Sequence, residues 1–399
     1  MAPSRAPLPS LPPGVLPTVP VNTPVTGPTV SIVMPCLNEE ETVGVCVTKA
    51  RGWLSASGVR GEVIVVDNGS TDRSIEVAAR AGARVVEELR PGYGQAYQRG
   101  FAEARGEFIV MGDSDDTYDF SNLTPLLEPL NHGSDLVLGN RFTGGIQNGA
   151  MPWAHRYIGS PIINYLIRLF IGADIGDSQS GFRAFKGNLA ERLRLRSGGM
   201  EFASEMIVRA ARAGLKITEV PASYGTRRGE SKLSTVRDGW RHLRFLLLAA
   251  PDFLFILPGL ALALLGVATF VISFAAPVGV EIGSLTWQPV FAATIFLAIG
   301  ANTLLLGMIA KLHGCAMGLL HEDRWVRLYR RVFRLESVLA LAVLMLLVGV
   351  ALDAGLFWVW ASGMHHPLGL QLASLAQTLL IVGAELGMAA FLVVTIDPL

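Results

Sequence analysis

The hydrophobic residues of this chain follow one pattern before Phe245 and another after it. In the first part, short apolar runs of strand length alternate with longer helical stretches. This alternation predicts right-handed crossovers and an α/β fold with a mainly parallel sheet covered by helices on both faces. Because ligands bind such sheets beyond the carboxyl ends of the strands, functional residues are expected directly after each apolar run. The expected strands and helices are, in order, Val30–Met34, Glu39–Leu54, Glu62–Val66, Ser74–Ala81, Gln95–Ala104, Phe108–Met111 and Leu136–Leu138.

In the second part, long apolar runs predict an all-α transmembrane domain of four helices. A helix of about 22 residues spans roughly 33 Å, which is enough to cross a hydrocarbon core of about 30 Å. The connection 311–337 carries six Lys and Arg residues, whereas the connections 277–288 and 361–369 carry none. The positive-inside rule therefore predicts an integral protein of the cell or inner membrane with a cytoplasmic N-terminal domain and C-terminus. The expected spans are about 253–276, 289–310, 338–360 and 370–396.

Two further segments border these parts. Residues 1–28 hold nine of the 22 prolines and almost no charge, which predicts a disordered tail. Residues 231–252 mix basic and apolar side chains around Trp240, which is typical of amphipathic helices on the anionic cytoplasmic leaflet. An ordinary solvated helix face is the alternative. The predicted boundaries are thus 29–230 for the α/β domain, 231–252 for the juxtamembrane helices and 253–399 for the transmembrane domain.

Charge and cysteine content exclude two classes of protein. The 399 residues contain 33 Lys and Arg and 33 Asp and Glu, and this zero net charge argues against a nucleic-acid partner. Only 17% of the residues are charged and 51% are apolar, as expected for a chain with a membrane-embedded part. Cys36, Cys46 and Cys315 are scattered and odd in number, so they form neither a disulfide framework nor a zinc site.

Acidic residues follow three of the expected strands. Asp67 precedes a glycine turn after the second run, and the segment 113–115 (Asp-Ser-Asp) follows the run that ends at Met111. Two carboxylates one residue apart can hold one divalent cation and leave positions for phosphate oxygens. After the first strand a simpler interpretation is available, in which Asn38 caps the next helix and Glu39 lies in its first turn. A parallel sheet would still gather all three strand ends on one rim.

Five segments carry a resemblance to a known family. They are Pro35–Glu39, Val65–Asp72, Gly106-Glu107 leading to Asp113-Ser114-Asp115, Asp177–Phe185, and Arg228-Gly229-Glu230-Ser231-Lys232. In this order they resemble family 2 glycosyltransferases of the GT-A fold, a Rossmann-like α/β architecture. The match is most similar to the branch of dolichol-phosphate mannose synthases and polyisoprenyl-phosphate glycosyltransferases, whose R-x-G-x-S-K signature resembles the last segment. The resemblance covers about residues 29–245, and four trailing spans also occur in some members.

The resemblance implies a site for a nucleotide-sugar donor. Pro35, Glu39 and Asp67 would line the pocket for the base and the ribose. Asp113 would contact the nucleotide, and together with Asp115 it would hold Mg2+ or Mn2+ against the diphosphate. The residues expected to bind the nucleotide sugar are Pro35, Asn38, Glu39, Asp67, Asp113 and Ser114, and the expected metal ligands are Asp113 and Asp115.

The resemblance also implies an acceptor site for the phosphate of a polyprenyl or dolichyl monophosphate. Arg156 and Ser160 are four residues apart, which would place them on one helix face beside that phosphate. Asp177 would lie near the reaction centre, as an orienting residue more than as a proton acceptor. The residues expected to bind the lipid phosphate are Arg141, Arg156, Ser160 and Lys232, and those expected to be catalytic are Asp115, Arg141, Asp177 and Arg228, with Arg228 and Lys232 closing over the phosphates.

The expected reaction depends on charge neutralisation and positioning. The acceptor phosphate is already an anion, so it has to be placed beside the anomeric carbon and needs no strong general base. A divalent cation and basic groups would neutralise the leaving diphosphate. One inverting displacement would give a β-linked sugar phosphate lipid. GDP-mannose and UDP-glucose both stay open as donors.

Several positions depart from the family pattern or lie outside it. Thr117 stands where the metal motif often has Gln, which argues against a third side-chain ligand. Tyr93 stands where relatives often have Lys or Leu, a change that bears on donor choice. Within the spans, Asp353 and Glu385 need partners and would line a lipid path or join protomers of a homo-oligomer. Asn302 is expected to hold helices together.

Two other functions stay open at this point. A processive polysaccharide synthase would carry Q-x-x-R-W near its acceptor channel, but here His321 takes the place of Gln before Arg324-Trp325. The soluble half also lacks the large insertion that such synthases need. A non-catalytic membrane component would use its spans to move or recruit a lipid-linked sugar, and the intact acidic and basic motifs argue against such a degenerate site.

Overall fold

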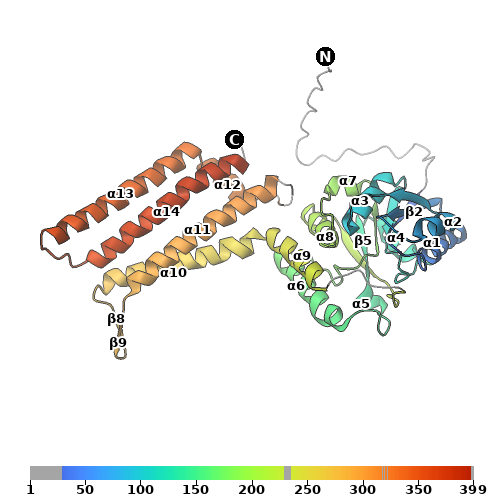
Figure 1. Ribbon diagram of the computed structural model, residues 1–399, viewed down its shortest axis with the longest axis horizontal. Coiled ribbons are helices and arrows are strands. Elements are labelled where there is room, and N and C mark those ends of the chain that lie inside the picture. Colours follow the sequence, from blue (N-terminus) through green and yellow to red (C-terminus); the bar gives the residue numbers. More distant parts are fainter. Residues whose placement is uncertain (1–28, 229–234, 317, 319, 321, 397–399) are drawn as a thin grey trace, which may run out of the picture.

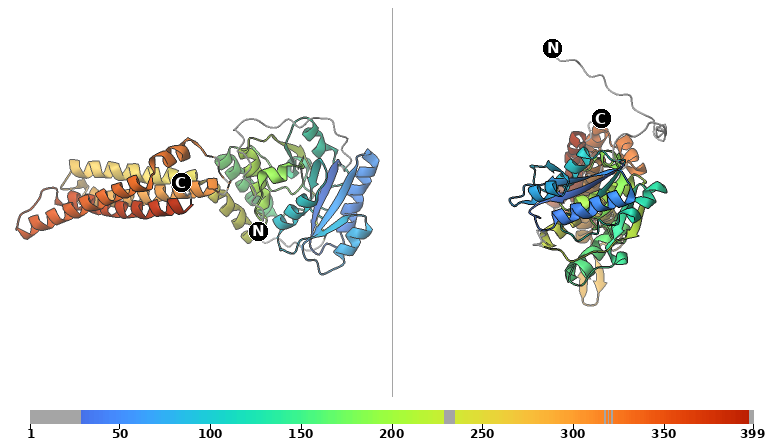
Figure 2. Two further views of the ribbon diagram at one scale, coloured as in Figure 1. Left: turned by 90° about the horizontal axis from the view of Figure 1, so that it is seen from above. Right: turned by 90° about the vertical axis from the view of Figure 1, so that its right-hand side faces the viewer.

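The computed structural model of the chain describes residues 29–228, 235–316, 318, 320 and 322–396. They form an α/β domain followed by a group of long helices that extends away from it (Figures 1 and 2). The tail expected at 1–28 lies outside the described residues, and so does Lys232. The predicted fold class, a mainly parallel α/β domain followed by four apolar helices, is confirmed.

The α/β domain is built on a seven-stranded sheet in the order β3-β2-β1-β4-β6-β5-β7. Four of its neighbouring pairs are parallel, and only β6 runs antiparallel, between β4 and β5. The short strands β3 (sequence RVVE) and β6 (RAFK) have only two apolar residues each, too few to be predicted from the pattern. The strands are β1 (Val30–Cys36), β2 (Gly61–Asp67), β3 (Arg84–Glu87), β4 (Phe108–Met111), β5 (Leu136–Asn140), β6 (Arg183–Lys186) and β7 (Ile217–Pro221).

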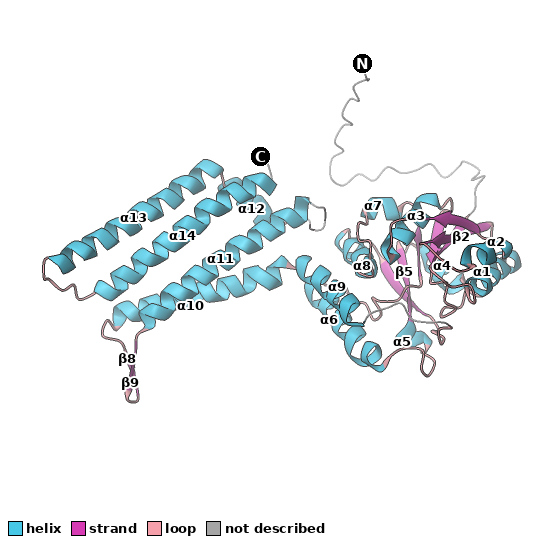
Figure 3. Cartoon of the chain, viewed as in Figure 1, coloured by secondary structure: helices cyan, strands magenta, loops and turns pink. Residues whose placement is uncertain are grey.

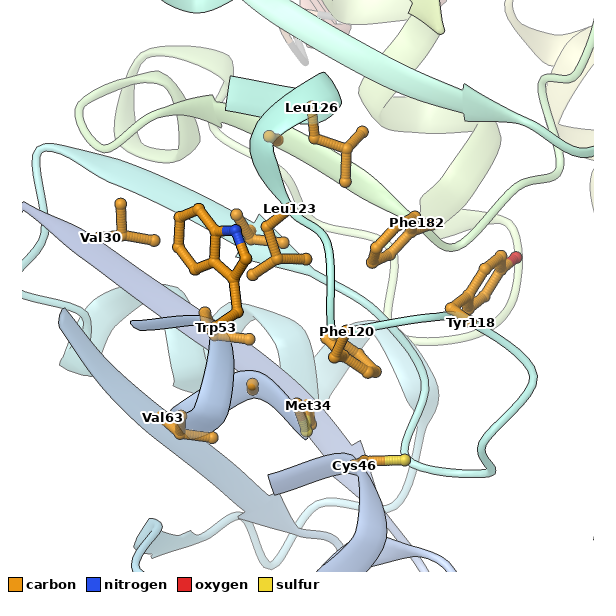
Figure 4. Packing of buried hydrophobic residues seen from close by; sticks show 14 of the residues in the cluster. Val30, Met34, Cys46, Trp53, Val63, Tyr118, Phe120, Leu123, Leu126 and Phe182 are labelled. Carbon is orange, nitrogen blue, oxygen red and sulfur yellow. The ribbon is translucent and has the colours of Figure 1, made fainter. Parts of the chain in front are cut away.

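Helices cover both faces of this sheet (Figure 3). On one face Trp53 of α1 and Leu123, which precedes α4, pack over the first strand at Val30 (Figure 4). On the other face α3, α6, α7 and α8 form a second core. β1 is apolar except for Ser31 because both of its faces are buried. The helices are α1 (Val43–Ser57), α2 (Ser74–Arg80), α3 (Tyr93–Glu103), α4 (Thr124–Asn131), α5 (Arg141–Gly144), α6 (Ser160–Ile171), α7 (Leu189–Leu193) and α8 (Phe202–Arg212).

The four helices that follow are long and apolar enough to cross a membrane. They pack as a row, with α10 against α11, α11 against α14, and α14 against α13. Polar side chains join the middle pair, because Thr294 hydrogen-bonds Ser374 and the amide of Asn302 donates to Glu385 (3.1 Å). The predicted role of Asn302 in joining helices is therefore confirmed. These helices are α10 (Leu257–Ala275), preceded by a π-helical turn (Asp252–Ile256), α11 (Pro289–Ala316), α13 (Leu335–Ala361) and α14 (Gly369–Ile396).

Three smaller elements connect the two parts or the long helices. The predicted juxtamembrane segment contains α9 (Thr235–Leu248), which packs on α6 and α8 and exposes Trp240. A hairpin, β8 (Val280–Ile282) and β9 (Leu285–Trp287), joins α10 to α11 at the end far from the α/β domain (Figure 1). The basic helix α12 (Arg324–Val332) joins α11 to α13 at the near end. Neither the hairpin nor α12 was expected, since short elements between spans leave no clear period in the sequence.

Candidate active site

The carboxyl ends of β1, β2 and β4 meet on one rim of the sheet. Cys36 at the end of β1 is in register with Asp67 at the end of β2, as parallel pairing requires. The hydroxyl of Ser114 donates to the carbonyl of Pro35 (2.7 Å), which ties the loop after β4 to the end of β1. The structure thus brings Pro35, Asp67 and the segment 113–115 together, where the sequence pattern places them.

The loops after β1 and β2 hold each other through side-chain hydrogen bonds. The buried carboxylate of Asp67 accepts the backbone N–H groups of Gly69 (3.0 Å) and Ser70 (3.1 Å). The side-chain oxygen of Asn38 accepts a hydrogen bond from the N–H of Thr71 (2.7 Å). The backbone of Asn38 is left-handed, with a φ of 53°. The helix-cap interpretation of Asn38 is wrong, because α1 begins only at Val43 and the amide joins two loops instead. This leaves Asn38 on the rim, beside the expected donor pocket.

Asp113 is half-buried beside a second carboxylate. Its Oδ1 accepts the hydroxyl of Tyr93 (2.9 Å) and, at 3.4 Å, that of Tyr97. Burial and the neighbouring Asp115 raise the pKa of Asp113 to about 7, while the Tyr93 hydrogen bond and the positive charge of Arg227 act in the opposite direction. Two carboxylates that repel each other in this way are a suitable place for a cation.

Arg227 crosses the site from the segment that follows β7. Its Nη2 lies 2.6 Å from Oε1 of Glu39, and its Nη1 lies 3.4 Å from Oδ2 of Asp115. Its Nε is buried and has no hydrogen-bond partner in the part of the chain that the structure describes. Arg227 therefore links the expected base pocket to the expected metal ligand.

Arg227 is one residue of the candidate site that the sequence reasoning missed. In the signature R-x-G-x-S-K one residue separates the arginine from the glycine, and before Gly229 that spacing is met by Arg227. Arg228, which directly precedes Gly229, is exposed. The spacing within the motif was thus the signal that points to Arg227, and the role expected of Arg228 stays a prediction.

The donor site fits a divalent cation only together with oxygens from a ligand. Among the described residues, no three His, Cys, Asp or Glu side chains are grouped so that they could hold a metal alone. Oδ1 of Asp115 already accepts the hydroxyl (2.5 Å) and the N–H (3.2 Å) of Thr117, so Oδ2 is the oxygen left for a cation. The guanidinium of Arg227 approaches this same oxygen. Mg2+ is commonly held by one or two carboxylates plus substrate phosphates, which matches this donor set.

A second charged pair lies on the same rim after β5. The carboxylate of Asp177 is fully buried and accepts the backbone N–H of Arg141 (2.9 Å), its Nε (2.7 Å) and its Nη2 (2.8 Å). Burial acts to lower the pKa of Arg141, but Tyr118 and Asp177 raise it above its ordinary value, so the guanidinium stays charged. Three accepted hydrogen bonds favour the orienting role predicted for Asp177 over proton transfer.

Two tyrosines connect the charged pair to the aspartate loop. The guanidinium of Arg141 lies over the ring of Tyr224, 5.1 Å from its centroid. The Tyr224 ring packs edge-on against Tyr118, which follows the aspartates on the same loop. The hydroxyl of Tyr118 accepts the N–H of Gly181 (2.9 Å). Tyr118 and Tyr224 thus lie between the aspartate loop and the Arg141–Asp177 pair, and no sequence motif indicates them.

The other residues expected at the lipid phosphate lie around the start of α6. Arg156 is in a π-helical turn (His155–Gly159) with its guanidinium over the ring of Tyr157, and Ser160 is buried at the first position of α6. Their roles stay predictions. Apolar side chains are exposed at helical spacing along α6 and the π-helical turn before it, and we name them the α6 stripe: Ile158, Ile162, Tyr165 and Leu169.

The chain is similar to known glycosyltransferases over both of its parts. Residues 31–194 match the family model described as glycosyl transferase family 2, and residues 308–397 match the glycosyltransferase family 2 C-terminal transmembrane region. The low-salt glycan biosynthesis hexosyltransferase Agl6 of Haloferax volcanii is 36% identical over 374 residues, 92% of this chain and 88% of that protein. The protein is thus a membrane glycosyltransferase. It belongs to glycosyltransferase family 2, as the resemblance of its motifs predicts.

Other relatives match about half of the chain. A dolichyl-phosphate hexose transferase of Haloferax volcanii is 33% identical over 209 residues, 52% of this chain and 88% of that protein. A dolichol-phosphate mannosyltransferase of Pyrococcus furiosus is 31% identical over 223 residues, 54% of this chain and 62% of that protein. Glucosyl-3-phosphoglycerate synthase from Mycobacterium tuberculosis, solved with Mn2+, uridine diphosphate and phosphoglyceric acid, shares 26% identity over 55% of this chain and 78% of that chain, with a TM-score of 0.44.

Proposed function

We propose that this protein transfers one hexose, with inversion, from GDP-mannose or UDP-glucose to a polyprenyl or dolichyl monophosphate at the cytoplasmic face of a membrane. One observation carries the proposal. The rim of the sheet joins a site suited to a cation, at Asp113 and Asp115, to a buried Arg141–Asp177 pair, in a domain attached to four apolar helices. The names of the two dolichol-linked relatives support the acceptor class.

The donor would bind on the half of the rim formed by β1, β2 and β4. Pro35, Asn38 and Asp67 would hold the base and ribose, and Asp113 and Asp115 would hold Mg2+ or Mn2+ beside the diphosphate. When bound, such a cation supplies electrostatic stabilisation of the leaving nucleoside diphosphate. The unpartnered Nε of Arg227 offers a further hydrogen bond to a phosphate oxygen.

The acceptor would bind beside Arg141. Asp177 fixes Nε and Nη2 of this arginine, so Nη1 is the nitrogen left for a phosphate, since no described residue hydrogen-bonds it. A phosphate oxygen would attack the anomeric carbon as the bond from that carbon to the donor diphosphate breaks. No proton has to be removed from the nucleophile, which agrees with an Asp177 carboxylate whose two oxygens already accept three hydrogen bonds from Arg141.

The polyprenyl phosphate would approach the site from the membrane along the exposed face of α6. The α6 stripe is exposed on a domain whose other large apolar side chains are mostly buried, and α6 packs against α9, which leads toward α10. Tyr and Trp are common where one side of a helix meets lipid headgroups, and both Tyr165 and Trp240 are exposed here. A stripe in contact with the leaflet would bring Arg156 and Ser160 to the depth of the lipid phosphate.

The test is transfer of radiolabelled sugar from a panel of GDP- and UDP-sugars to polyprenyl phosphate, with and without EDTA. We expect label to enter the organic phase from one donor, only when Mn2+ or Mg2+ is present, and as a lipid that carries one sugar. A ladder of oligomers would indicate a processive synthase. If a folded protein transferred no label from any donor to several polyprenyl phosphates, the proposal would be wrong.

A further inference from the structure

The Tyr93 hydroxyl makes a contact that the residues often found at this position in relatives cannot make in the same way. It donates a hydrogen bond to Oδ1 of Asp113 at 2.9 Å. A leucine has no donor, and a lysine would bring a positive charge and a flexible chain. We propose that Tyr93 is a positioning residue that holds Oδ1 of Asp113, so that only Oδ2 is presented to the metal ion and nucleotide. This inference rests on the proposed function, because it refines the role given there to Asp113.

The opposite side of the same carboxylate is kept open by a glycine. A Cβ atom at Gly181 would lie 2.8 Å from Oδ2 of Asp113 and 2.9 Å from the Tyr93 hydroxyl. Such a methyl group would cover the oxygen that the hydroxyl leaves unoccupied. Tyr93 and Gly181 therefore act on the two oxygens of one carboxylate, the first by holding Oδ1 and the second by leaving space at Oδ2.

The backbone around Tyr93 is fixed to the loop before α8. The N–H of Gly94 donates to the carbonyl of Gly198 (2.9 Å), and the N–H of Gln95 reaches the same oxygen (3.3 Å). A Cβ atom at Gly94 would lie 2.2 Å from the carbonyl oxygen of Ser197, so only glycine allows this approach. The first turn of α3 is thus held in place, and the hydroxyl of Tyr93 with it.

A buried ion pair holds that loop in turn. The carboxylate of Glu205, almost fully buried, accepts the N–H groups of Arg196 (3.0 Å) and Ser197 (2.7 Å) and pairs with Arg209 (2.7 Å). Arg209 also donates to the carbonyl of Gly318, between α11 and α12 (2.7 Å). A chain of hydrogen bonds and an ion pair therefore links the loop that holds Tyr93 to the connection between α11 and α13. Because its backbone is already fixed, the Tyr93 hydroxyl loses little further conformational freedom when it orients the Asp113 carboxylate.

The test removes the hydroxyl and keeps the ring. Tyr93 packs edge-on against Tyr97 with centroids 4.9 Å apart, and Tyr93→Phe preserves this packing. The full-length protein is titrated with Mn2+ in the presence of UDP and, separately, of GDP, and free Mn2+ is followed by electron paramagnetic resonance. Loss of a hydrogen bond to a charged group predicts an apparent Mn2+ affinity about tenfold weaker in Tyr93→Phe. Tyr97→Phe, which removes a longer contact, is expected to lose about twofold.

A matched control is available on α12. The buried hydroxyl of Tyr329 has no hydrogen-bond partner in the described part of the chain, so Tyr329→Phe should bind Mn2+ as the wild type does. Thermal unfolding of each preparation checks that the variants are folded. In transfer assays we expect Tyr93→Phe to be slow at low Mn2+ and to recover the wild-type rate at saturating Mn2+, because positioning is lost and chemistry is kept.

Three results would overturn the inference. The first is an unchanged Mn2+ affinity in Tyr93→Phe. The second is a loss of transfer that saturating Mn2+ does not restore in a protein that unfolds at the normal temperature. The third is a wild-type protein that fails to bind Mn2+ both in the presence of UDP and in the presence of GDP. A wild type that binds Mn2+ and nucleotide but transfers no sugar to polyprenyl phosphate would contradict the proposed function alone, since the titration needs no acceptor.

Discussion

Two arginine–carboxylate pairs lie on the same rim of the sheet, and they are held in different ways. Arg227 approaches Asp115 at 3.4 Å, is 22% exposed and keeps one nitrogen without a partner in the described part of the chain. Arg141 shares three hydrogen bonds of 2.7–2.9 Å with Asp177, which is not exposed at all. We expect a metal ion to displace the Arg227 guanidinium from Asp115 in the first pair, which we call the exchangeable pair, and we expect the buried Arg141–Asp177 pair to stay in place. Under the proposed function, we therefore expect a donor half whose charges rearrange around the ligand and an acceptor half that is already formed.

The largest expected effect is on the buried pair. Asp177→Asn leaves the Arg141 charge in the interior without a counter-charge, which should lower the free energy of unfolding by about 3–5 kcal/mol. Thermal and denaturant unfolding of the purified protein measures this loss. Asp119→Asn is the control, because Asp119 is an exposed carboxylate outside the site. If Asp177→Asn unfolded like Asp119→Asn, the view of a preformed acceptor half would fail.

Removal of the carboxylate from the exchangeable pair should affect activity and leave the fold intact. Asp115→Ala deletes the oxygen left for a cation, and transfer of labelled sugar should fall by about 10²–10³-fold. Because Asp113 also loses a like-charged neighbour, the unfolding temperature should not fall. Asp119→Ala, with a carboxylate removed four residues away, should retain normal transfer. Full activity of Asp115→Ala would rule out the metal-dependent mechanism.

The arginine of the exchangeable pair should matter less than its carboxylate. Arg227→Gln should reduce transfer about tenfold, because one charge near the diphosphate is lost, and should change the free energy of unfolding by less than about 1 kcal/mol. Arg228→Gln is the matched variant, and we expect it to have the smaller effect. A larger loss of transfer in Arg228→Gln than in Arg227→Gln would assign the role near the diphosphate to Arg228, as the sequence analysis expects.

The smallest effect is expected at the membrane side of the acceptor half. Replacing Ile162 and Tyr165 of the α6 stripe by Ser should raise the KM for polyprenyl phosphate in vesicles about threefold to tenfold, by loss of apolar contact with lipid. The KM for the nucleotide sugar should not change. Ile75→Ser, an exposed apolar position on α2, controls for general surface effects. An equal change in the KM for polyprenyl phosphate and in the KM for the nucleotide sugar would show that the α6 stripe supports folding and does not contact lipid.

The sequence was sufficient for features that follow from the rules of parallel sheets. Asp67 and the segment 113–115 lie where the ends of apolar runs place them, because chain direction alone brings these ends to one rim. Local rules were less reliable. Asn38 is a residue type that often caps helices, but its side-chain oxygen accepts a hydrogen bond from the N–H of Thr71, thirty-three residues away. A contact over that separation has no local signal.

The missing parts of the site are those that depend on distant segments. Arg227 reaches Glu39 across 188 positions of sequence, and Tyr224 lies under Arg141 from a different strand end. Tyr93 could be marked as unusual from the sequence, but its partner Asp113 could not be named. β6, the antiparallel strand between β4 and β5, contains a buried arginine, Arg183, where a continuous apolar run would have marked a strand. The reason in each case is that tertiary contacts decide which polar residues meet.

The arrangement of the long helices in a row has a consequence for the product. The helices lie side by side, and most polar side chains between α11 and α14 hydrogen-bond each other, although Oε2 of Glu385 is buried without a partner among the described residues. We infer that the described parts of these four helices hold no water-filled route for a hydrated sugar. Under the proposed function, we expect each sugar-linked lipid to stay in the leaflet where it is made, so that a separate transporter must carry it across before an enzyme on the other side can use it.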